Sequence, residues 1–360
     1  MAESNCEVPG GTEEVVEALN DLPSTEDLED PSLPHPPKPF EDFYQGGSVT
    51  ITHPDDIPVR WDDLTGLHNA KLILKEKLMM PFKFPHLFEG RVSNEKNVLL
   101  YGPPGCGKSM LMKALAKESC ACLMTVNSYS MMSRMVTDRA QFVRAVFACA
   151  AANHPCIILI EDIEVFIEEE NTEAREVLFQ LMSTKLTASL PVIAMTRFPW
   201  LLYKQMGLRS SFPTLVYVPI PDKTSRNLLF KMHLNIQPAV SEEEFEELAK
   251  RTEGYTVSDI LVLVRDAAME PVREIQRATH FRLERHQSED KPDEIVDMET
   301  ACLSSDPGAQ AKSWMDIGPD TLYVKPITMD HLWKCLSRCK SCMRSDELDL
   351  YKKFTEDGRS

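Results

Sequence analysis

The chain has 360 residues, 43% of them hydrophobic and 26% charged, which suffices for two or three domains with cores of their own. This composition excludes a wholly disordered chain, and ten cysteines spread along a chain without a signal peptide at its start indicate reduced thiols rather than a disulfide framework. The formal net charge of −17 argues against direct binding of nucleic acid, because that affinity comes largely from Lys and Arg side chains.

Residues 1–58 differ from the rest of the chain in composition. They contain fourteen acidic residues against the single basic residue Lys38, and nine of the 25 prolines. Proline lacks an N–H group and fixes φ, so a segment rich in proline rarely forms regular elements. We therefore expect residues 1–58 to form a flexible acidic arm.

Residues 59–221 alternate short apolar runs with longer helical stretches. The five apolar runs lie at 97–101, 123–126, 157–160, 191–195 and 215–218. They are continuously apolar, as expected of strands buried on both faces, and the helices between them exclude antiparallel hairpins. This pattern predicts a large α/β nucleotide-binding subdomain whose parallel five-stranded sheet is flanked by helices.

Residues 222–360 favour helices over strands. Helices are predicted at about 224–234, 241–252, 256–279, 328–337 and 345–354. A polar stretch at about 282–326 separates the third from the fourth and contains a Ser-Ser-Asp-Pro-Gly turn cluster. We interpret residues 222–360 as a smaller helical subdomain that carries this stretch as an insertion and ends in a C-terminal helix.

A phosphate-binding loop follows the first predicted strand. The loop reads Gly102, Pro103, Pro104, Gly105, Cys106, Gly107, Lys108 and Ser109, which fits the pattern G-x-x-x-x-G-K-[ST] between a strand and a helix. Glycines let backbone N–H groups turn toward phosphate oxygens ahead of a helix N-terminus. Lys108 would reach the β- and γ-phosphates of ATP, and Ser109 would bind Mg²⁺.

Two acids directly follow the third predicted strand, Glu161 and Asp162. In open α/β sheets, ligands bind beyond the carboxyl ends of the strands. This position predicts Glu161 as a second ligand of Mg²⁺ and Asp162 as the group that activates the attacking water. The alternative is a buried strand that ends in solvated acids.

Further motifs connect the sequence to a known family. They are Val-Arg-Trp-Asp-Asp-Leu-Thr-Gly-Leu at 59–67, Pro-Phe-Lys-Phe-Pro-His-Leu-Phe-Glu-Gly at 81–90, Gly-Tyr-Thr-Val-Ser-Asp-Ile at 254–260, and Lys-Lys-Phe-Thr-Glu-Asp at 352–357. With the phosphate loop, they resemble the AAA ATPases of the meiotic clade, and within it the branch of vacuolar protein sorting-associated protein 4. The resemblance covers about residues 59–357. It includes the insertion, which katanin- and spastin-like relatives lack.

The resemblance implies a function as well as a fold. It implies a hexameric ring, of this chain alone or with a paralogous subunit, that hydrolyses ATP with Mg²⁺. Such a ring pulls subunits of ESCRT-III-like polymers through its central pore in endosomal and vacuolar sorting. The resemblance also places Gly66 beside the adenine. It implies a cytoplasmic protein that reaches the endosomal membrane through partners and does not bind nucleic acid directly.

The sequence departs from the family pattern at several functional positions. The family's paired acids are Asp then Glu, so Asp162 is one methylene shorter than the expected water activator. The resemblance aligns Arg197 with a sensor Asn, a surface charge being the alternative, and it leaves Arg209 as the candidate arginine finger. Met135 stands where relatives have an aromatic pore residue, and residues 1–58 are too short and proline-rich for the family's three-helix microtubule-interacting and transport domain.

These departures predict that ATP hydrolysis is slow or lost. One alternative function is therefore a catalytically weakened nucleotide-binding subunit with a structural or regulatory role in a mixed AAA ring. A second alternative is katanin-like severing of microtubules, which expects basic loops and an aromatic pore.

Overall fold

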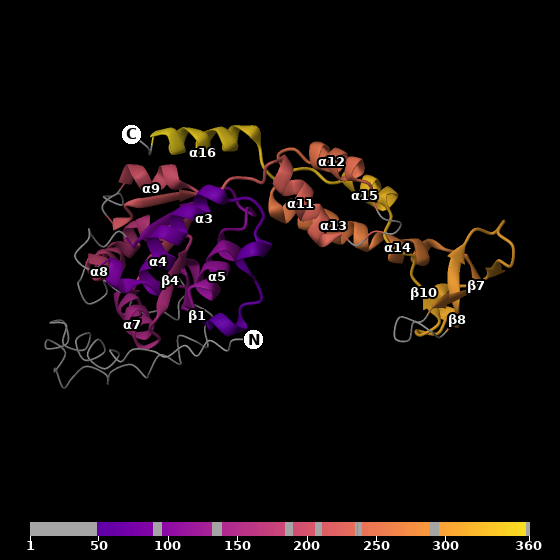
Figure 1. The fold of residues 1–360 in the computed structure, drawn as a ribbon, viewed down its shortest axis with the longest axis horizontal. Helices are drawn as coiled ribbons and strands as arrows, with labels where there is room; N and C mark the ends of the chain where they lie inside the picture. Colours follow the sequence, from indigo (N-terminus) through magenta and orange to yellow (C-terminus); the bar gives the residue numbers. More distant parts are fainter. Residues whose placement is uncertain are drawn as a thin grey trace. The chain divides into compact units, whose positions relative to one another are not determined.

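The computed structural model describes residues 49–88, 96–131, 139–183, 190–205, 211–234, 236, 240–287 and 295–357. The chain divides into two compact units: unit 1 is Met1–Pro219 with Arg344–Ser360, and unit 2 is Ile220–Met343. Figure 1 shows strands and helices in unit 1, and in unit 2 a group of helices followed by a small sheet. Among the described residues, none of the helices combines the length and apolarity that crossing a membrane requires.

Unit 1 is built on a six-stranded sheet with the order β1-β3-β4-β5-β2-β6. Its strands are β1 (Val49–Thr52), β2 (Val98–Tyr101), β3 (Cys122–Asn127), β4 (Cys156–Glu161), β5 (Val192–Thr196) and β6 (Thr214–Tyr217). Strands β2 to β6 pair in parallel, and every residue of β2 and β5 is buried. The predicted α/β fold with its parallel strands is confirmed, and the continuous apolar runs are the strands of the sheet.

The sixth strand, β1, lies within the segment that we expected to be a flexible arm. It pairs antiparallel with β3, and Val49, opposite Val126, is only 2% exposed. Ile57 is buried as well. The short β-branched run Val-Thr-Ile-Thr carried a strand signal that the proline and acid content of residues 1–58 concealed. The expectation of an arm is therefore wrong for residues 49–58, and residues 1–48 lie outside the described part of the chain.

Helices flank this sheet (Figure 1). They are α3 (His68–Leu74), α4 (Met80–Lys83), α5 (Lys108–Glu118), α6 (Ser128–Met131), α7 (Arg139–Ala152), α8 (Thr172–Ser183) and α9 (Pro199–Gln205), with a π-helical segment at Lys75–Met79 before α4. Phe147 of α7 and Leu178 of α8 belong to the same buried cluster as Ile158 of β4. This core fixes β4, and thereby the acids that follow it.

Unit 2 contains five α-helices among its described residues: α11 (Lys223–His233), α12 (Glu242–Arg251), α13 (Val257–Ala268), α14 (Glu270–Arg277) and α15 (Met329–Leu336). Side chains of Asp222, Ser241 and Thr256 cap the first three by accepting hydrogen bonds from backbone N–H groups. The sequence predicted one helix over 256–279. The structure divides that stretch at Met269, because Pro271 fits the first turn of a helix and not its interior.

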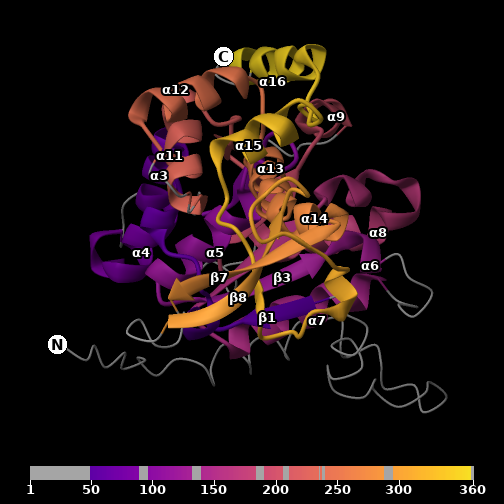
Figure 2. The same cartoon turned by 90° about the vertical axis from the view of Figure 1, so that its right-hand side faces the viewer.

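The predicted insertion at 282–326 contains most of a second sheet. Its strands are β7 (His280–Gln287), β8 (Ile295–Cys302), β9 (Gln310–Ala311) and β10 (Leu322–Tyr323), in the order β10-β8-β7-β9. The long antiparallel pair of β7 and β8 is visible in Figure 2. The sequence of this stretch indicates no strands, because exposed strands alternate in polarity and lack the continuous apolar runs of unit 1.

The last helix, α16 (Ser345–Asp357), belongs to unit 1, whereas the sequence grouped it with the helical subdomain. Tyr351 and Phe354 are its buried residues. Their spacing of three puts them on one face, which the sequence shows, but the partner of that face is set by tertiary packing. Figure 1 shows α16 next to α9 in unit 1.

Candidate nucleotide-binding and catalytic site

The phosphate loop lies between β2 and α5, as the sequence predicted. Gly102 approaches Val218 so closely that a Cβ atom would lie 2.2 Å from the Val218 carbonyl oxygen, so no side chain fits there. Gly107, with φ of 91°, is the N-cap of α5. Glycine adopts this left-handed conformation at little cost. The loop therefore places backbone N–H groups ahead of the N-terminus of α5, where an anion is stabilised.

Lys108 is held by the loop itself. Its Nζ donates hydrogen bonds of 2.8 Å to the carbonyl oxygens of Gly102 and Pro103. Burial lowers the pKa of Lys108 to about 8. Desolvation makes this ammonium group costly without a counter-charge. An anion in the loop would supply that counter-charge, so Lys108 suits a phosphate ligand.

Ser109 and Glu161 meet at the edge of the sheet. The Ser109 hydroxyl donates to Glu161 Oε1 at 3.3 Å, across 52 residues of chain. Glu161 ends β4, and Ser128 Oγ donates to its backbone carbonyl at 2.5 Å, which fixes the strand end. A hydroxyl and a carboxylate side by side are oxygen ligands of the kind that Mg²⁺ prefers. These two residues fit a divalent cation.

Asp162 and Arg197 form an ion pair. Arg197 Nη2 lies 3.0 Å from Asp162 Oδ1, although the two residues are 35 positions apart in the sequence. Asp162 directly follows β4, and Arg197 directly follows β5. Asp162 has φ of 50°, in the left-handed region that aspartate tolerates better than most residues. The structure thus places the candidate sensor against the candidate water activator, and Arg197 is more than an isolated surface charge.

Glu164 is a third acid at this site, and sequence analysis did not single it out. Both of its carboxylate oxygens are shielded from solvent, and burial raises its pKa. Charge interactions link Glu164 to Lys108, Asp162 and Arg197. The signal was present in the Glu-Asp-Ile-Glu run, whose last acid follows two residues after Asp162. Without coordinates, that residue resembled one more solvated acid.

The resemblance placed Gly66 beside the adenine. Gly66 has φ of 67°, and the next residue, Leu67, is the left-handed N-cap of α3. Leu67 also lines a pocket of unit 1 together with Tyr101, the last residue before the phosphate loop, and Tyr217. Gly66 thus lies next to a hollow that adjoins the loop, and its contact with adenine stays a prediction.

Two of the candidate residues lie outside the described part of the chain. They are Arg209, the candidate finger, and Met135, the candidate pore residue. Their roles stay predictions.

Comparisons with known proteins bear on the family. The sequence matches the ATPase family associated with various cellular activities (AAA) over residues 98–220, the AAA+ lid domain over 242–283, and the Vps4 C terminal oligomerisation domain over 299–358. Over 323 residues it is 36% identical to vacuolar protein sorting-associated protein 4B of Pongo abelii. This match covers 86% of this chain and 72% of the relative. The chain belongs to the AAA ATPase family. Vacuolar protein sorting-associated protein 4A of Homo sapiens is 35% identical over 323 residues, covering 86% of this chain and 73% of the relative.

Solved structures agree with this fold. The crystal structure of the FIGL-1 AAA domain has a TM-score of 0.69 at 23% identity and covers 91% of this AAA ATPase and 98% of that chain. A structure that concerns katanin self-assembly has a TM-score of 0.65 at 23% identity, and the match covers 91% of this chain and 99% of that chain. At such identity the likeness shows the fold alone. Family membership itself implies that this AAA ATPase binds nucleotide with a divalent metal ion and assembles into oligomers.

Proposed function

We propose that this AAA ATPase binds ATP with Mg²⁺ and uses slow hydrolysis to disassemble ESCRT-III-like polymers. The carrying observation is the contact between Ser109 and Glu161 at the carboxyl end of the sheet, directly after Lys108, which the phosphate loop holds. The match to the Vps4 C terminal oligomerisation domain supports the choice of substrate class. The identity to vacuolar protein sorting-associated protein 4B supports a role in endosomal and vacuolar sorting, in the cytoplasm and, through partners, at the endosomal membrane.

Each residue has a defined task in this proposal. Lys108 exchanges its two loop carbonyls for the β- and γ-phosphates, which compensates its buried charge. Ser109 and Glu161 would hold Mg²⁺, which would supply positive charge against the charge that develops on the phosphates. Asp162 accepts a proton from the attacking water. Arg197 turns from Asp162 to the γ-phosphate, since both are anions within reach of one guanidinium group.

The ion pair also favours a second candidate, a weakened subunit in a mixed ring. While Arg197 donates to Asp162 Oδ1 at 3.0 Å, that carboxylate oxygen is occupied by the guanidinium group and not free to contact the attacking water. Its side chain is also one methylene shorter than in the family pattern, and a misplacement of about 1 Å can cost about 100-fold in rate. Katanin-like severing has weaker support, because the katanin structure shares only the fold.

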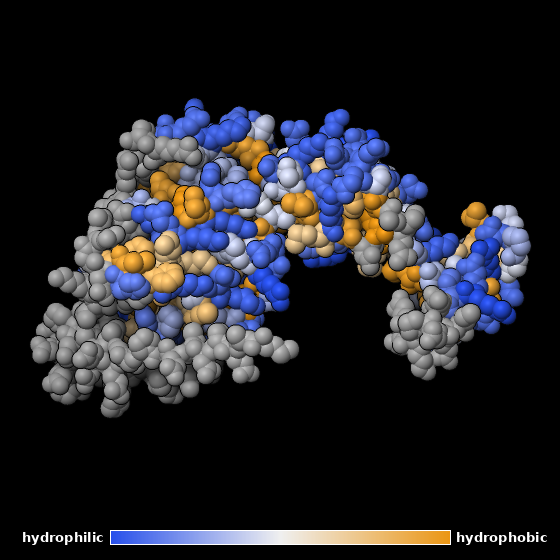
Figure 3. Space-filling model, viewed as in Figure 1, coloured by the Kyte–Doolittle hydropathy of each residue, from blue (hydrophilic) through white to orange (hydrophobic). Residues whose placement is uncertain are grey.

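Assembly into a ring completes the proposal. Large apolar side chains remain exposed on unit 2, among them Leu228, Met232 and Val262, at 45% to 55%. Figure 3 shows apolar patches over the helices of unit 2. Exposed apolar patches of this kind suit contacts between subunits. In a hexameric ring, Arg209 of one subunit would reach the ATP of its neighbour.

Two variants of the purified chain test the proposal. Lys108→Ala removes the phosphate contact, so calorimetric titration with ATP and Mg²⁺ should show binding for the native protein and none for the variant. Asp162→Asn keeps the shape of the side chain but removes the base, so phosphate release should fall at least about 100-fold while ATP still binds.

Binding of ATP that survives in Lys108→Ala contradicts the assigned phosphate site. Turnover that survives in Asp162→Asn shows that another group activates the water.

A further inference from the structure

Tyr351 of α16 contacts Arg197, the residue at the candidate sensor position. Its hydroxyl donates a hydrogen bond of 2.5 Å to the backbone carbonyl of Arg197, 154 residues earlier in the chain. The ring is only 3% exposed and lies edge-on to Trp200 of α9, with 5.2 Å between the ring centroids. Burial raises the pKa of Tyr351, so its hydroxyl stays protonated and remains a donor. The donor is therefore fixed in one place by packing.

The two ends of Arg197 face different partners. Its carbonyl accepts from Tyr351, while its guanidinium group lies 3.0 Å from the Asp162 carboxylate. The backbone of Arg197 links the end of β5 to the start of α9, and neither element includes it. Its position therefore depends on contacts such as the one from Tyr351. A continuous chain of contacts runs from α16 through Arg197 to Asp162.

The same helix also contacts the strand that leads into the phosphate loop. Thr355 Oγ1 lies 3.0 Å from the hydroxyl of Tyr101, and the Phe354 ring lies edge-on to the Tyr101 ring at 5.1 Å. Tyr101 directly precedes Gly102 of the loop. Thus α16 has one contact directed to the loop and a separate one directed to the sensor position.

We propose that Tyr351 is a positioning residue, which holds Arg197 where its guanidinium group can exchange Asp162 for the γ-phosphate. This inference rests on the roles proposed above for Asp162 and Arg197. Without the phenol hydroxyl, a part-buried carbonyl loses its donor and the turn at Arg197 loosens. The expected consequence concerns the ATP state alone, because ADP has no γ-phosphate for Arg197 to contact.

The test begins with Tyr351→Phe, which keeps the ring contacts and removes one hydroxyl. We expect kcat to fall about five-fold, as for the loss of one hydrogen bond in the transition state, while the KM for ATP and the Kd for ADP stay unchanged. Thr355→Val is the matched variant, since it removes another hydroxyl from the same helix. Its contact leads to the phosphate loop, so its effect should fall on the affinities for ATP and ADP alike.

A double-mutant cycle separates positioning from a merely structural role. In an Arg197→Ala background, Tyr351→Phe should cause no further loss of kcat, because the side chain that it positions is gone. An equal loss in both backgrounds overturns the inference, and so does an unchanged kcat in Tyr351→Phe. The inference is also overturned if Tyr351→Phe lowers the melting temperature and reduces kcat and the affinity for ADP together.

The same measurements distinguish this inference from the proposed function. If Asp162→Asn leaves turnover unchanged, the proposed catalytic role fails. If Asp162→Asn and Arg197→Ala both slow turnover but Tyr351→Phe does not, only the positioning role fails.

Discussion

At the scale of single residues, the pair of Asp162 and Arg197 is suited to exchange. Their side chains are 27% and 41% exposed, and ion pairs in such surroundings contribute about 0–1 kcal/mol. A phosphate group carries more charge than one carboxylate and accepts two parallel hydrogen bonds from arginine. Arg197 can therefore leave Asp162 at small cost. The defect that remains is the length of the Asp162 side chain.

Restoring that length should speed hydrolysis. In Asp162→Glu, the added methylene brings the carboxylate closer to the attacking water, so we expect kcat to rise about ten-fold, because about 1 Å of misplacement costs up to about 100-fold. The measurement is phosphate release at saturating ATP and Mg²⁺. Glu161→Asp is the matched control, since it shortens the neighbouring acid and should raise the Mg²⁺ requirement instead. A kcat that falls in Asp162→Glu would show that the backbone already compensates for the shorter acid.

At the scale of elements, the sequence predicts those whose signal is local. The strands of unit 1 were recognisable because residues such as those of β2 are all apolar and all buried. The phosphate loop was recognisable because one motif contains all its residues. β1 and β7 to β10 were missed, because short or half-exposed strands lack such runs. The allocation of α16 and the contact between Tyr351 and Arg197 depend on packing between distant segments, which no local pattern encodes.

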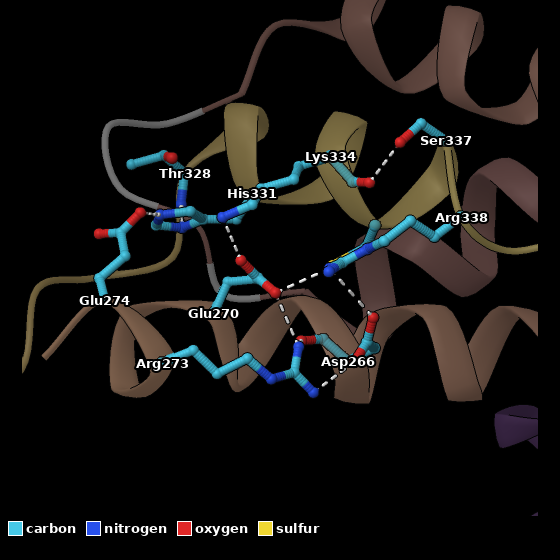
Figure 4. A network of polar contacts seen from close by, with 10 residues as sticks. Asp266, Glu270, Arg273, Glu274, Thr328, His331, Lys334, Ser337 and Arg338 are labelled. Carbon is cyan, nitrogen blue, oxygen red and sulfur yellow. Dashed lines mark hydrogen bonds and ion pairs between the residues drawn. The ribbon is translucent and has the colours of Figure 1, made fainter. Parts of the chain in front are cut away.

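An ion network joins α14 to α15 in unit 2, on either side of the second sheet in the sequence. Glu270 is fully buried; its Oε1 accepts hydrogen bonds from Arg273 at 2.8 Å and from Arg338 at 2.7 Å, and its Oε2 forms an ion pair with Lys334 at 2.5 Å. Figure 4 shows these side chains converging from the two helices and from the turn after α15. One carboxylate thus holds three cations. The network thus joins the two helices between which β7 to β10 lie in the sequence.

Neutralising that carboxylate should destabilise unit 2. Glu270→Gln removes the carboxylate that Lys334, Arg273 and Arg338 share, although both arginines keep an ion pair with Asp266. Breaking a buried pair costs about 3–5 kcal/mol, and the remaining pairs and the partial exposure of the cations reduce our expectation to about 2 kcal/mol. Denaturant unfolding of the full chain, followed by hydrogen exchange in α14 and α15, measures this loss. Glu247→Gln is the control, because Glu247 makes an exposed ion pair with Arg251 on one helix. An equal effect of both variants would contradict the role of the network.

The effect of Glu270→Gln should also depend on pH. The ion pair with Lys334 and the hydrogen bonds from Arg338 and Arg273 hold the pKa of Glu270 well below its usual range. A carboxyl whose pKa is lower in the folded state stabilises the fold above its ordinary pKa, and this stabilisation is lost as the pH falls toward the folded value. The difference in stability between native protein and variant should therefore shrink as the pH is lowered below about 4.5. A difference that stays constant over this range would show that charge is not its cause.

At the scale of the whole molecule, the open question is whether one subunit completes the site of another. The described part of unit 1 supplies the candidate phosphate, metal and sensor residues from within one chain. The candidate finger Arg209 lies outside the described residues, and its role stays a prediction. In a ring with head-to-tail interfaces, each subunit offers its neighbour a different surface from the one that it receives. A finger that acts between subunits would then make turnover depend on assembly, and arginine fingers contribute about 10³–10⁵ in rate in other phosphate-loop enzymes.

Complementation between two inactive variants tests this dependence. Arg209→Ala keeps its own base but offers no finger, whereas Asp162→Asn offers a finger but lacks a base. Each alone should hydrolyse ATP at least about 100-fold more slowly than the native ring. In an equal mixture, about a quarter of the interfaces would combine the finger of an Asp162→Asn subunit with the intact base of an Arg209→Ala subunit. Turnover should therefore recover to about a quarter of the native rate. Capture of the untagged variant through an affinity tag on the other first establishes that the two variants assemble together. Co-assembly without recovery would show that Arg209 does not act on the neighbouring site, because the mixture then contains every part of a complete site across its interfaces.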